Sequence, residues 1–202
     1  MMFNRCIVEG KIADGWRPVR ITPVPKKETG KFRPIACTSL LLKVLEKLVL
    51  GRINSYANLD DIYQFAYCKK RSTLDALSLL VHSVLSNLDS TGKAFRMCFL
   101  DYSNAFNSVN RAQLLSDLEE TGLPHRLLCW IHDYFRERYQ YTSLNGQNSS
   151  MLPIDSGVLQ GAILSPFLFS FYIRYLPTNP DILSVKYADD VTVGSRSDEN
   201  FQ

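Results

Sequence analysis

Three aspartates are the residues of this chain best placed to do chemistry. Asp189 and Asp190 stand side by side between two short alternating runs, and Asp101 directly follows the apolar run 94–100. If the strands that carry them are neighbours, the carboxylates converge, and their like charges raise one another's pKa. A divalent cation relieves that repulsion, because Mg²⁺ prefers oxygen ligands and is commonly held by one or two carboxylates. Two such ions can clamp the attacking and leaving oxygens of a phosphoryl displacement.

Each aspartate taken alone has a simpler explanation. Aspartate is a favoured turn residue, so Asp189 and Asp190 could form the tip of a hairpin and nothing more. Asp101 could be the N-cap of a helix over 102–106. A phosphohydrolase with two metal ions could use the same three acids. The aspartates by themselves leave turn chemistry, helix capping and metal chemistry open.

The elements that must position the acids are short strands. Alternation and turn residues predict a strand over 94–100, which is apolar enough to be buried, and three hairpins. The hairpins pair 19–22 with 32–36, 139–144 with 151–155 across Asn145-Gly146, and 182–187 with 191–194 across Ala188-Asp-Asp190.

Helices separate these strands without strict alternation. Helical spacing predicts helices over 40–53, 72–88, 111–121, 124–136 and 160–176. Thr38 or Ser39 could cap the first of them, and Ser72 with Asp75 forms a capping box for the second. The expected buried face of the first helix consists of Leu41, Val44, Leu45, Leu48 and Val49. The mixed order of elements predicts an α+β fold.

Composition excludes several classes of protein. The chain has 202 residues, of which 46% are hydrophobic and 21% charged, which is typical of a globular domain. No apolar run approaches the roughly 20 residues that span a bilayer, and the N-terminus has no signal-peptide pattern. We therefore expect no membrane partner and an intracellular protein of the cytoplasm or nucleus that is not secreted.

Cysteine and histidine positions do not indicate a metal site. The five cysteines include no Cys-x-x-Cys pair, which argues against a disulfide framework or a zinc site and for reduced thiols. His82, His125 and His132 have no cysteine or histidine partner at metal-ligand spacing, so we expect surface or helix histidines.

Charge is unevenly distributed along the chain. Residues 1–75 hold 14 Lys or Arg against 7 Asp or Glu, whereas residues 76–202 hold 9 against 13. A basic first part suits phosphate-bearing partners, and an acidic second part suits cations. Ordinary solvated charge explains the same counts.

Five segments resemble the motifs of reverse transcriptases, and their sequences are most similar to the non-LTR (LINE-like) retrotransposon type. Tyr187-Ala-Asp-Asp190 is similar to the Y-x-D-D motif of that family. The run 99–109 is similar to its first catalytic motif, and 157–169 to its G-V-x-Q-G-x-x-L-S-P-x-L-F motif. The fingers segment and the Q-x-G-F-R-x-x-R-S-T block have counterparts in 31–47 and 64–73. The resemblance covers about residues 16–196.

The resemblance implies a right-hand polymerase fold with fingers and a partial palm, in which helices back an antiparallel sheet. It places the fingers at about 16–92 and 110–150 and the palm at about 93–109 and 151–202. We expect a reverse transcriptase domain cut off after the Tyr187–Asp190 motif, with the thumb absent.

The resemblance also implies an active site. Asp101, Asp189 and Asp190 would be the catalytic acids and the ligands of two Mg²⁺ ions, with Mn²⁺ possible. Phe106 would lie under the sugar of the incoming nucleotide and select deoxynucleotides, although an ordinary core phenylalanine is the alternative. Gln160 and Gly161 match the nucleotide- and template-contacting turn of the family, where a plain turn before a helix is the alternative.

Basic residues complete the expected site. Arg33 and then Lys31 would bind the triphosphate, because a guanidinium can grip phosphate oxygens bidentately. Lys26 could equally be a solvated turn lysine. A second basic group consists of Lys69, Lys70 and Arg71. These residues would contact the template backbone along its length, or they are simply exposed.

The implied activity is RNA-directed DNA polymerisation, with an RNA template, a DNA primer and deoxynucleoside triphosphates as partners. The alternative is an inactive remnant that at most binds nucleic acid. Two departures bear on this choice. Asn107 stands where the family usually has aspartate, and Leu159 stands where many members have proline.

Overall fold

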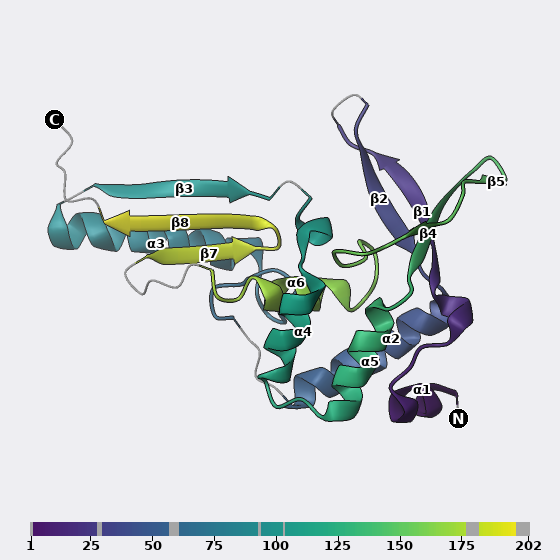
Figure 1. Cartoon of the computed structure of the whole chain (residues 1–202). Helices are drawn as coiled ribbons and strands as arrows, with labels where there is room; N and C mark the ends of the chain where they lie inside the picture. The colour runs from purple at the N-terminus through teal and green to yellow at the C-terminus, as the bar shows by residue number, and fades with distance from the viewer. Residues whose placement is uncertain are drawn as a thin grey trace. The chain divides into compact units, whose positions relative to one another are not determined.

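A computed structural model describes residues 2–27, 30–56, 61–92, 94–102, 104–176 and 182–196. The chain divides into two compact units. The first comprises residues 1–59 and 106–169, and the second comprises residues 60–105 and 170–202. Both contain strands and helices (Figure 1), which confirms the predicted α+β class. Within the described residues, every helix is too short or too polar to cross a lipid bilayer.

A mixed sheet forms the β part of the first unit. Its strands are β1 (Pro18–Pro25), β2 (Phe32–Cys37), β4 (Tyr139–Leu144), β5 (Gln147–Asn148) and β6 (Leu152–Pro153). The order is β2-β1-β4-β5, and β6 also pairs with β4. Strand β1 runs antiparallel to β2 and parallel to β4. The predicted basic hairpin is thus confirmed as β1 and β2.

The predicted hairpin at Asn145-Gly146 is confirmed, because β4 pairs antiparallel with β6 inside the predicted strand 151–155, and with β5 next to the turn. Both residues have positive φ, 50° and 79°, which a two-residue type I′ hairpin turn requires. The turn leads from β4 directly into β5, whereas the predicted strand 151–155 is reduced to the two residues of β6. The turn signal and the predicted pairing were therefore correct, and only the length of the second strand differs.

Helices of the first unit are α1 (Met2–Glu9), α2 (Leu40–Tyr56), α4 (Arg111–Glu119) and α5 (His125–Phe135), and α6 (Ser165–Tyr172) begins in this unit. Short 3-10 helices cover Asp14–Trp16 and Ala105–Ser108. The predicted helix 160–176 is therefore too long. It begins only at Ser165, where Pro166 is tolerated in the first turn because its missing N–H has no helical partner there.

The predicted buried face of α2 is wrong in part. The buried side chains are Leu42, Leu45, Glu46, Val49 and Ile53. By contrast, Leu41, Val44 and Leu48 are between 41% and 49% exposed. Apolar residues nearly surround this helix, so periodicity did not select one face, and tertiary contacts decided it. Ser39 caps the helix, because its hydroxyl accepts a hydrogen bond from the Leu42 N–H at 3.1 Å.

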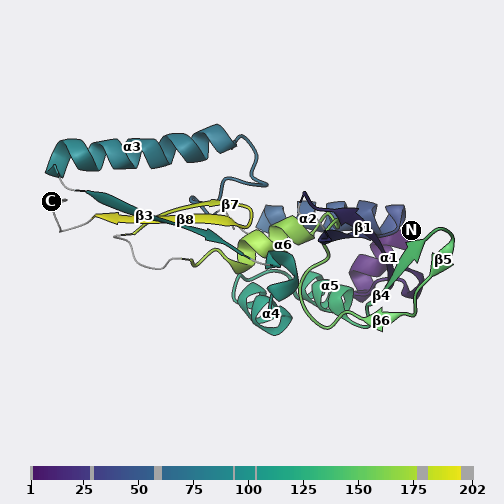
Figure 2. The ribbon, with the colours of Figure 1, turned by 90° about the horizontal axis from the view of Figure 1, so that it is seen from above.

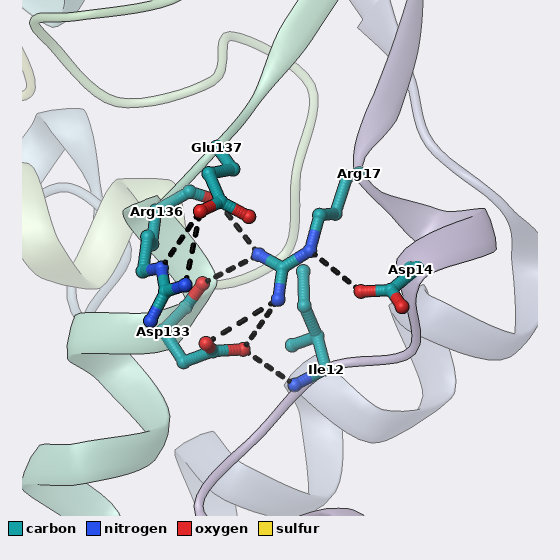
Figure 3. A network of polar contacts seen from close by, with 6 residues as sticks. All are labelled: Ile12, Asp14, Arg17, Asp133, Arg136 and Glu137. Atoms are coloured by element: carbon teal, nitrogen blue, oxygen red, sulfur yellow. Dashed lines mark hydrogen bonds and ion pairs between the residues drawn. The ribbon is translucent and has the colours of Figure 1, made fainter.

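A buried arginine ties the N-terminal segment to the end of α5 (Figure 3). Arg17 forms an ion pair with Asp133 at 3.1 Å, donates to the Arg136 carbonyl at 2.8 Å, and contacts Asp14 at 3.0 Å. The Asp133 carboxylate also accepts from the Ile12 N–H at 2.8 Å. Because these contacts satisfy the guanidinium and the carboxylate together, they fix the start of β1 beside the start of β4.

The second unit contains a three-stranded antiparallel sheet, and the family resemblance had implied an antiparallel sheet without its number of strands. Its strands are β3 (Phe95–Asp101), β7 (Leu183–Tyr187) and β8 (Asp190–Arg196), in the order β3-β8-β7. Helix α3 (Thr73–Thr91) lies along the sheet (Figures 1 and 2) and carries the predicted capping box between Ser72 and Asp75. A small apolar core joins α3 to β7 and contains Phe65, Ala76, Leu79, Leu80, Leu183 and Val185.

Strand β3 is exposed, contrary to the expectation of a buried strand. Phe99 is 71% exposed, and Met97 and Leu100 are 43% and 44% exposed. Strand β3 is the edge of the sheet among the described residues, so only one neighbouring strand covers it. Hydrophobicity identified the strand, but it could not reveal that both of its faces are largely exposed.

Candidate active site

Asp101 and Asp190 are directly opposite each other in the β3–β8 ladder. Opposed residues of an antiparallel pair project to the same face, with Cβ atoms roughly 4.5–5.5 Å apart. Asp101 is a strand residue, and the following 3-10 helix begins only at Ala105, so it is not the N-cap of a helix over 102–106. The structure therefore brings together two of the three predicted catalytic acids on adjacent strands.

Asp189 occupies the tight turn beside this pair. Tyr187 pairs with Asp190, which leaves only Ala188 and Asp189 to form the loop between β7 and β8. Ala188 has a φ of 58°, a left-handed conformation that a residue with a Cβ rarely adopts. The predicted hairpin is confirmed, with the difference that Asp190 belongs to β8 and only Asp189 to the turn.

The three carboxylates form a cluster of like charge. Partial burial and then repulsion from Asp189 and Asp101 raise the pKa of Asp190 above its ordinary value. Across the part of the chain that the structure describes, none of the three forms an ion pair or a hydrogen bond with a side chain. The cluster thus lacks a protein cation to balance its charge.

The donor set fits a hard divalent cation. Carboxylate oxygens are the ligands that Mg²⁺ and Mn²⁺ prefer, and Mg²⁺ usually retains waters and takes further ligands from substrate phosphates. Within the described residues, no three His, Cys, Asp or Glu side chains, the three aspartates included, are arranged so that they could hold a metal ion together. The opposed carboxylates of Asp101 and Asp190 would supply two ligands, and water and substrate would supply the rest.

Gln160 and Gly161 form a turn that rests on β2 in the first unit. The Ala36 N–H donates to the Gln160 carbonyl at 2.6 Å. Gly161 has a φ of 116°, and a Cβ there would lie 2.7 Å from the Ala36 carbonyl oxygen and 3.3 Å from the Ile35 side chain. The position therefore requires glycine, both for its backbone conformation and for its close approach to the strand.

A buried glutamate holds the segment that follows this turn. Glu46 on α2 accepts hydrogen bonds from the backbone N–H groups of Ile163 and Leu164 at 2.6 and 3.0 Å, just before α6 begins. Burial raises the pKa of Glu46, and these two N–H groups and Arg138 act in the opposite direction. The fingers-like motif 31–47 is thereby joined to the Gln160–Gly161 turn through a side chain as well as through β2.

Arg33 lies on β2, and Lys31 directly precedes that strand. Arg33 is exposed and shares one face of β2 with Ile35, because strand side chains alternate. Ile35 is the residue whose side chain reaches the Gly161 position. The structure thus places the Arg33 strand and the Gln160–Gly161 turn side by side within the first unit. Lys31 is exposed at the turn, where its carbonyl accepts from the Lys26 N–H at 2.8 Å.

Phe106 packs against the segment that carries Gln160. Its ring stacks on Phe169 with centroids 5.0 Å apart, and its carbonyl accepts from the Val158 N–H at 2.7 Å. Gly157 fits closely beside it, since a Cβ there would lie 2.5 Å from the Asn107 Cα. Phe106 is half-buried, so its ring both packs on a neighbour and reaches the surface.

Arg111 fixes the start of the Gly157 motif. Its guanidinium donates to the carbonyls of Ile154, Ser156 and Gly157 at 2.6, 3.0 and 2.8 Å, and it lies over the Phe135 ring. Sequence reasoning missed this arginine. Arg111 directly follows Asn110, the N-cap of α4, and this position gave no signal of such a role. All of its hydrogen-bond acceptors are backbone carbonyls distant in sequence.

The predicted template-binding residues differ in their surroundings. Lys69 and Lys70 are exposed, whereas Arg71 is half-buried. Arg71 donates to the carbonyls of Asp61 and Gln64 at 2.7 and 2.6 Å, and thereby folds the loop that precedes α3. A nucleic-acid contact by Lys69 and Lys70 stays a prediction, and Arg71 has a structural role in addition to any such contact.

Sequence reasoning also missed a buried ion pair beneath the Tyr187–Asp190 hairpin. Lys186 is fully buried, and its ammonium contacts Asp61 at 2.6 Å. Another correction concerns His125, which is a helix residue as expected but has a cysteine partner, because its Nε2 lies 3.3 Å from the Cys129 sulfur one turn along α5. All five cysteines are free thiols, as predicted.

Comparisons with known proteins agree with these observations. The family profile described as reverse transcriptase (RNA-dependent DNA polymerase) matches residues 24–202. The chain is 28% identical to the RNA-directed DNA polymerase from mobile element jockey of Drosophila melanogaster, over 98% of this chain and 23% of that protein. It is 32% identical to the Pol polyprotein from the type-2 retrotransposable element R2DM of the same species, over 95% of this chain and 18% of that protein.

Solved structures support the polymerase fold. Telomerase from Candida tropicalis, in complex with a telomeric RNA fragment, matches with a TM-score of 0.64 at 12% identity, over 94% of this chain and 37% of that one. Telomerase from Candida albicans matches with a TM-score of 0.62 at 13% identity, over 96% of this chain and 42% of that one. At such identities the likeness concerns the fold alone.

This chain spans about a fifth of the length of the curated relatives it matches. The predicted resemblance to enzymes of non-LTR retrotransposons is confirmed by those relatives, and divalent-metal dependence is general in their family. The division into fingers and palm stays a prediction, as do the roles of the individual site residues. The opposed aspartates, the hairpin motif and the family match together lead to one conclusion: the chain belongs to the reverse transcriptase (RNA-dependent DNA polymerase) family.

Proposed function

We propose that this chain carries the catalytic centre of an RNA-directed DNA polymerase from a non-LTR retrotransposon. The observation that carries the proposal is the register of the β3–β8 ladder, which sets Asp101 opposite Asp190 with Asp189 in the adjoining turn. Such a cluster of uncompensated carboxylates suits nucleotidyl transfer, in which cations and phosphate oxygens complete the site.

Asp101, Asp189 and Asp190 would hold two Mg²⁺ ions, or Mn²⁺ in their place. When bound, such ions stabilise the charge that develops on the attacking and leaving oxygens of a phosphoryl transfer. The carboxylates of Asp101 and Asp190 project to one face of the sheet, and Asp189 lies in the adjoining turn. The tight loop at Ala188 fixes where the Asp189 backbone lies, and this limits how far its carboxylate can move.

Other residues would bind the deoxynucleoside triphosphate. Arg33 and Lys31 supply positive charge for the triphosphate, and the Gln160 amide can both donate and accept beside the closely packed Gly161. The half-buried ring of Phe106 would lie against the sugar and exclude a ribose 2′-hydroxyl. The contacts of Glu46 and of β2 support this arrangement, since they fix the Gln160–Gly161 turn next to the strand that carries Arg33.

The RNA template and DNA primer would be bound chiefly through phosphates. Lys69 and Lys70 are exposed next to the loop that Arg71 organises, and contacts of this kind are independent of sequence and sensitive to salt. We expect the 202-residue chain to add single nucleotides and to make few long products.

Single-nucleotide addition tests the proposal. The chain, in excess over a poly(rA)/oligo(dT) substrate, is supplied with labelled dTTP and Mg²⁺, and extension by one residue is measured. Asp189→Asn should abolish the addition, whereas Glu120→Gln, which neutralises an exposed acid of the first unit, should not change it. Undiminished addition by Asp189→Asn would refute the assignment. Hydrolysis of free nucleotide without primer would instead indicate a phosphohydrolase.

A further inference from the structure

A short segment before α3 runs along the free edge of β7. Gln64 and Lys186 form an isolated parallel bridge. The Phe65 N–H donates to the Lys186 carbonyl at 2.8 Å, and the Lys186 N–H donates to the Tyr63 carbonyl at 2.8 Å. The segment 63–65 therefore acts as an additional short strand beside the arm of the hairpin that leads to Asp189.

The Gln64 side chain reaches from this segment into the hairpin turn. It is 1% exposed, and its Oε1 accepts hydrogen bonds from the backbone N–H groups of Ala188 at 3.1 Å and Ala66 at 3.0 Å. Both partners are donors, so only the oxygen of the side-chain amide can satisfy them. One buried oxygen thus connects two backbone segments that are distant in sequence.

Ala188 is the residue of the turn that most needs support. It is the first loop residue between β7 and β8, and its φ of 58° lies in the left-handed region. Its N–H is outside the strand ladder, because the hairpin closes with the pairing of Tyr187 and Asp190. The partly buried Ala188 N–H finds its acceptor in the Gln64 oxygen, and this hydrogen bond favours the left-handed conformation that precedes Asp189.

Gln64 is itself held rigidly. The Arg71 guanidinium donates to the Gln64 carbonyl at 2.6 Å and to the Asp61 carbonyl at 2.7 Å. Because Arg71 bridges both ends of the segment 61–64, the backbone that carries Gln64 has little freedom to shift. A side chain can hold another group in place only when its own backbone is held in place.

The Lys186 ammonium joins the same network from the hairpin side. It contacts the Asp61 carboxylate at 2.6 Å and donates to the carbonyls of Ile173 and Arg174 at 3.0 and 3.1 Å. All three protons of the ammonium therefore have an acceptor, which a buried lysine needs. Segment 61–66 is thus bonded to the hairpin through the Lys186 backbone, the Lys186 side chain and the Ala188 N–H.

We propose that Gln64 is a positioning residue for the catalytic aspartates, because its buried amide oxygen holds the Ala188 N–H and thereby sets the backbone of Asp189. This inference rests on the proposed function, since it concerns the same cation site. It assigns Gln64 no contact with substrate or metal. Its expected effect is on cation affinity and on the order of the turn, with template binding unchanged.

Binding of Mn²⁺ to the full 202-residue chain tests the proposal, with free Mn²⁺ measured by electron paramagnetic resonance. Gln64→Met keeps the size and removes the acceptor, and it should weaken Mn²⁺ binding by about tenfold, as is typical when a supporting partner of a ligand is lost. Gln64→Glu keeps the acceptor and should bind Mn²⁺ within about threefold of the wild type. Hydrogen exchange of the Ala188 amide, followed by ¹⁵N NMR, should accelerate only in Gln64→Met.

A control separates positioning from general stability. Asn87→Leu replaces another buried amide of the second unit, on α3, and should lower the melting temperature without changing Mn²⁺ affinity. Equal Mn²⁺ affinity of Gln64→Met and the wild type, with unchanged exchange at Ala188, would overturn the proposal. Failure of the wild type to bind Mn²⁺, or binding that Asp101→Asn leaves intact, would instead refute the cation site and hence the proposed function.

Discussion

Asp101 and Asp190 lie opposite each other in adjacent antiparallel strands, and no positively charged side chain of the described residues pairs with either. Like charges in directly opposed positions destabilise a sheet. The arrangement therefore makes the folded protein less stable than it would be with neutral residues, and this cost supports the proposed catalytic role of the pair.

Replacing Asp190 by asparagine should stabilise the protein when no divalent cation is present. The change removes repulsion from Asp101 and Asp189, and we expect the free energy of unfolding to rise by up to about 1 kcal/mol. Urea unfolding in the presence of EDTA measures this free energy. Addition of Mg²⁺ should stabilise the wild type and have little effect on Asp190→Asn. Glu120→Gln, at an exposed acid of the first unit, is the matched control and should change neither value.

Cation affinity should depend on pH through Asp190. Partial burial and the neighbouring Asp189 and Asp101 raise its pKa, so Asp190 takes up a proton at a higher pH than an ordinary aspartate. Because a carboxyl must be ionised to bind a cation, Mn²⁺ affinity should fall as the pH falls through this raised pKa. Titration of Mn²⁺ at several pH values measures the dependence. Asp190→Asn should bind more weakly at neutral pH with a flatter profile, and an equally steep profile would contradict the assignment.

Gly161→Ala should disrupt the turn that carries Gln160. The new Cβ would meet the Ala36 carbonyl oxygen at 2.7 Å, in addition to the strain of a φ of 116°. Gly146→Ala is the matched control, because Gly146 also has positive φ but no atom within 4 Å of the added Cβ. We expect the Gly161 variant to lose clearly more stability in urea unfolding and to bind dTTP more weakly. Equal losses of stability in the two variants would show that the close approach of Gly161 to β2 is unimportant.

Glu46 should be replaceable by glutamine but not by leucine. Glu46→Leu leaves the N–H groups of Ile163 and Leu164 without their acceptor, and each unsatisfied group costs about 1–3 kcal/mol. Glu46→Gln keeps an acceptor oxygen and removes the charge whose burial raises the pKa of the residue.

The raised pKa of Glu46 also has a consequence for the pH dependence of stability. A carboxyl whose pKa is higher in the folded state contributes stability that is present at low pH and lost as the pH rises through that folded pKa. Urea unfolding between pH 4 and 7 should therefore show a smaller decline for Glu46→Gln than for the wild type. Indistinguishable pH profiles would contradict this view of Glu46.

Phe106→Ala should relax the choice between deoxynucleotides and ribonucleotides. If the ring lies against the sugar, its removal admits a 2′-hydroxyl, and addition of UTP relative to dTTP should rise about tenfold or more in the single-nucleotide assay. Phe169→Leu, which changes the ring stacked on Phe106 at 5.0 Å, is the control for lost packing. Reduced stability with unchanged selectivity in Phe106→Ala would mean that the residue is only part of the core.

The sequence by itself determined most of the strands and helices, and it pointed to the residues that are proposed to carry the chemistry. Turn residues located the hairpins at Asn145-Gly146 and Ala188-Asp189, and the capping box at Ser72 marked the start of α3, because these signals depend on neighbours in the chain. The motif around Asp189 was recognisable for the same reason.

Contacts between distant segments were decided only by the tertiary structure. The opposition of Asp101 to Asp190 depends on the register of two strands far apart in sequence, and the burial of Glu46 and Lys186 depends on backbone groups that become available only after folding. Apolar content alone could not reveal that β3 is exposed, nor which face of α2 is packed. Local patterns fix the conformation of a segment, whereas register and burial arise from the partners that each segment finds.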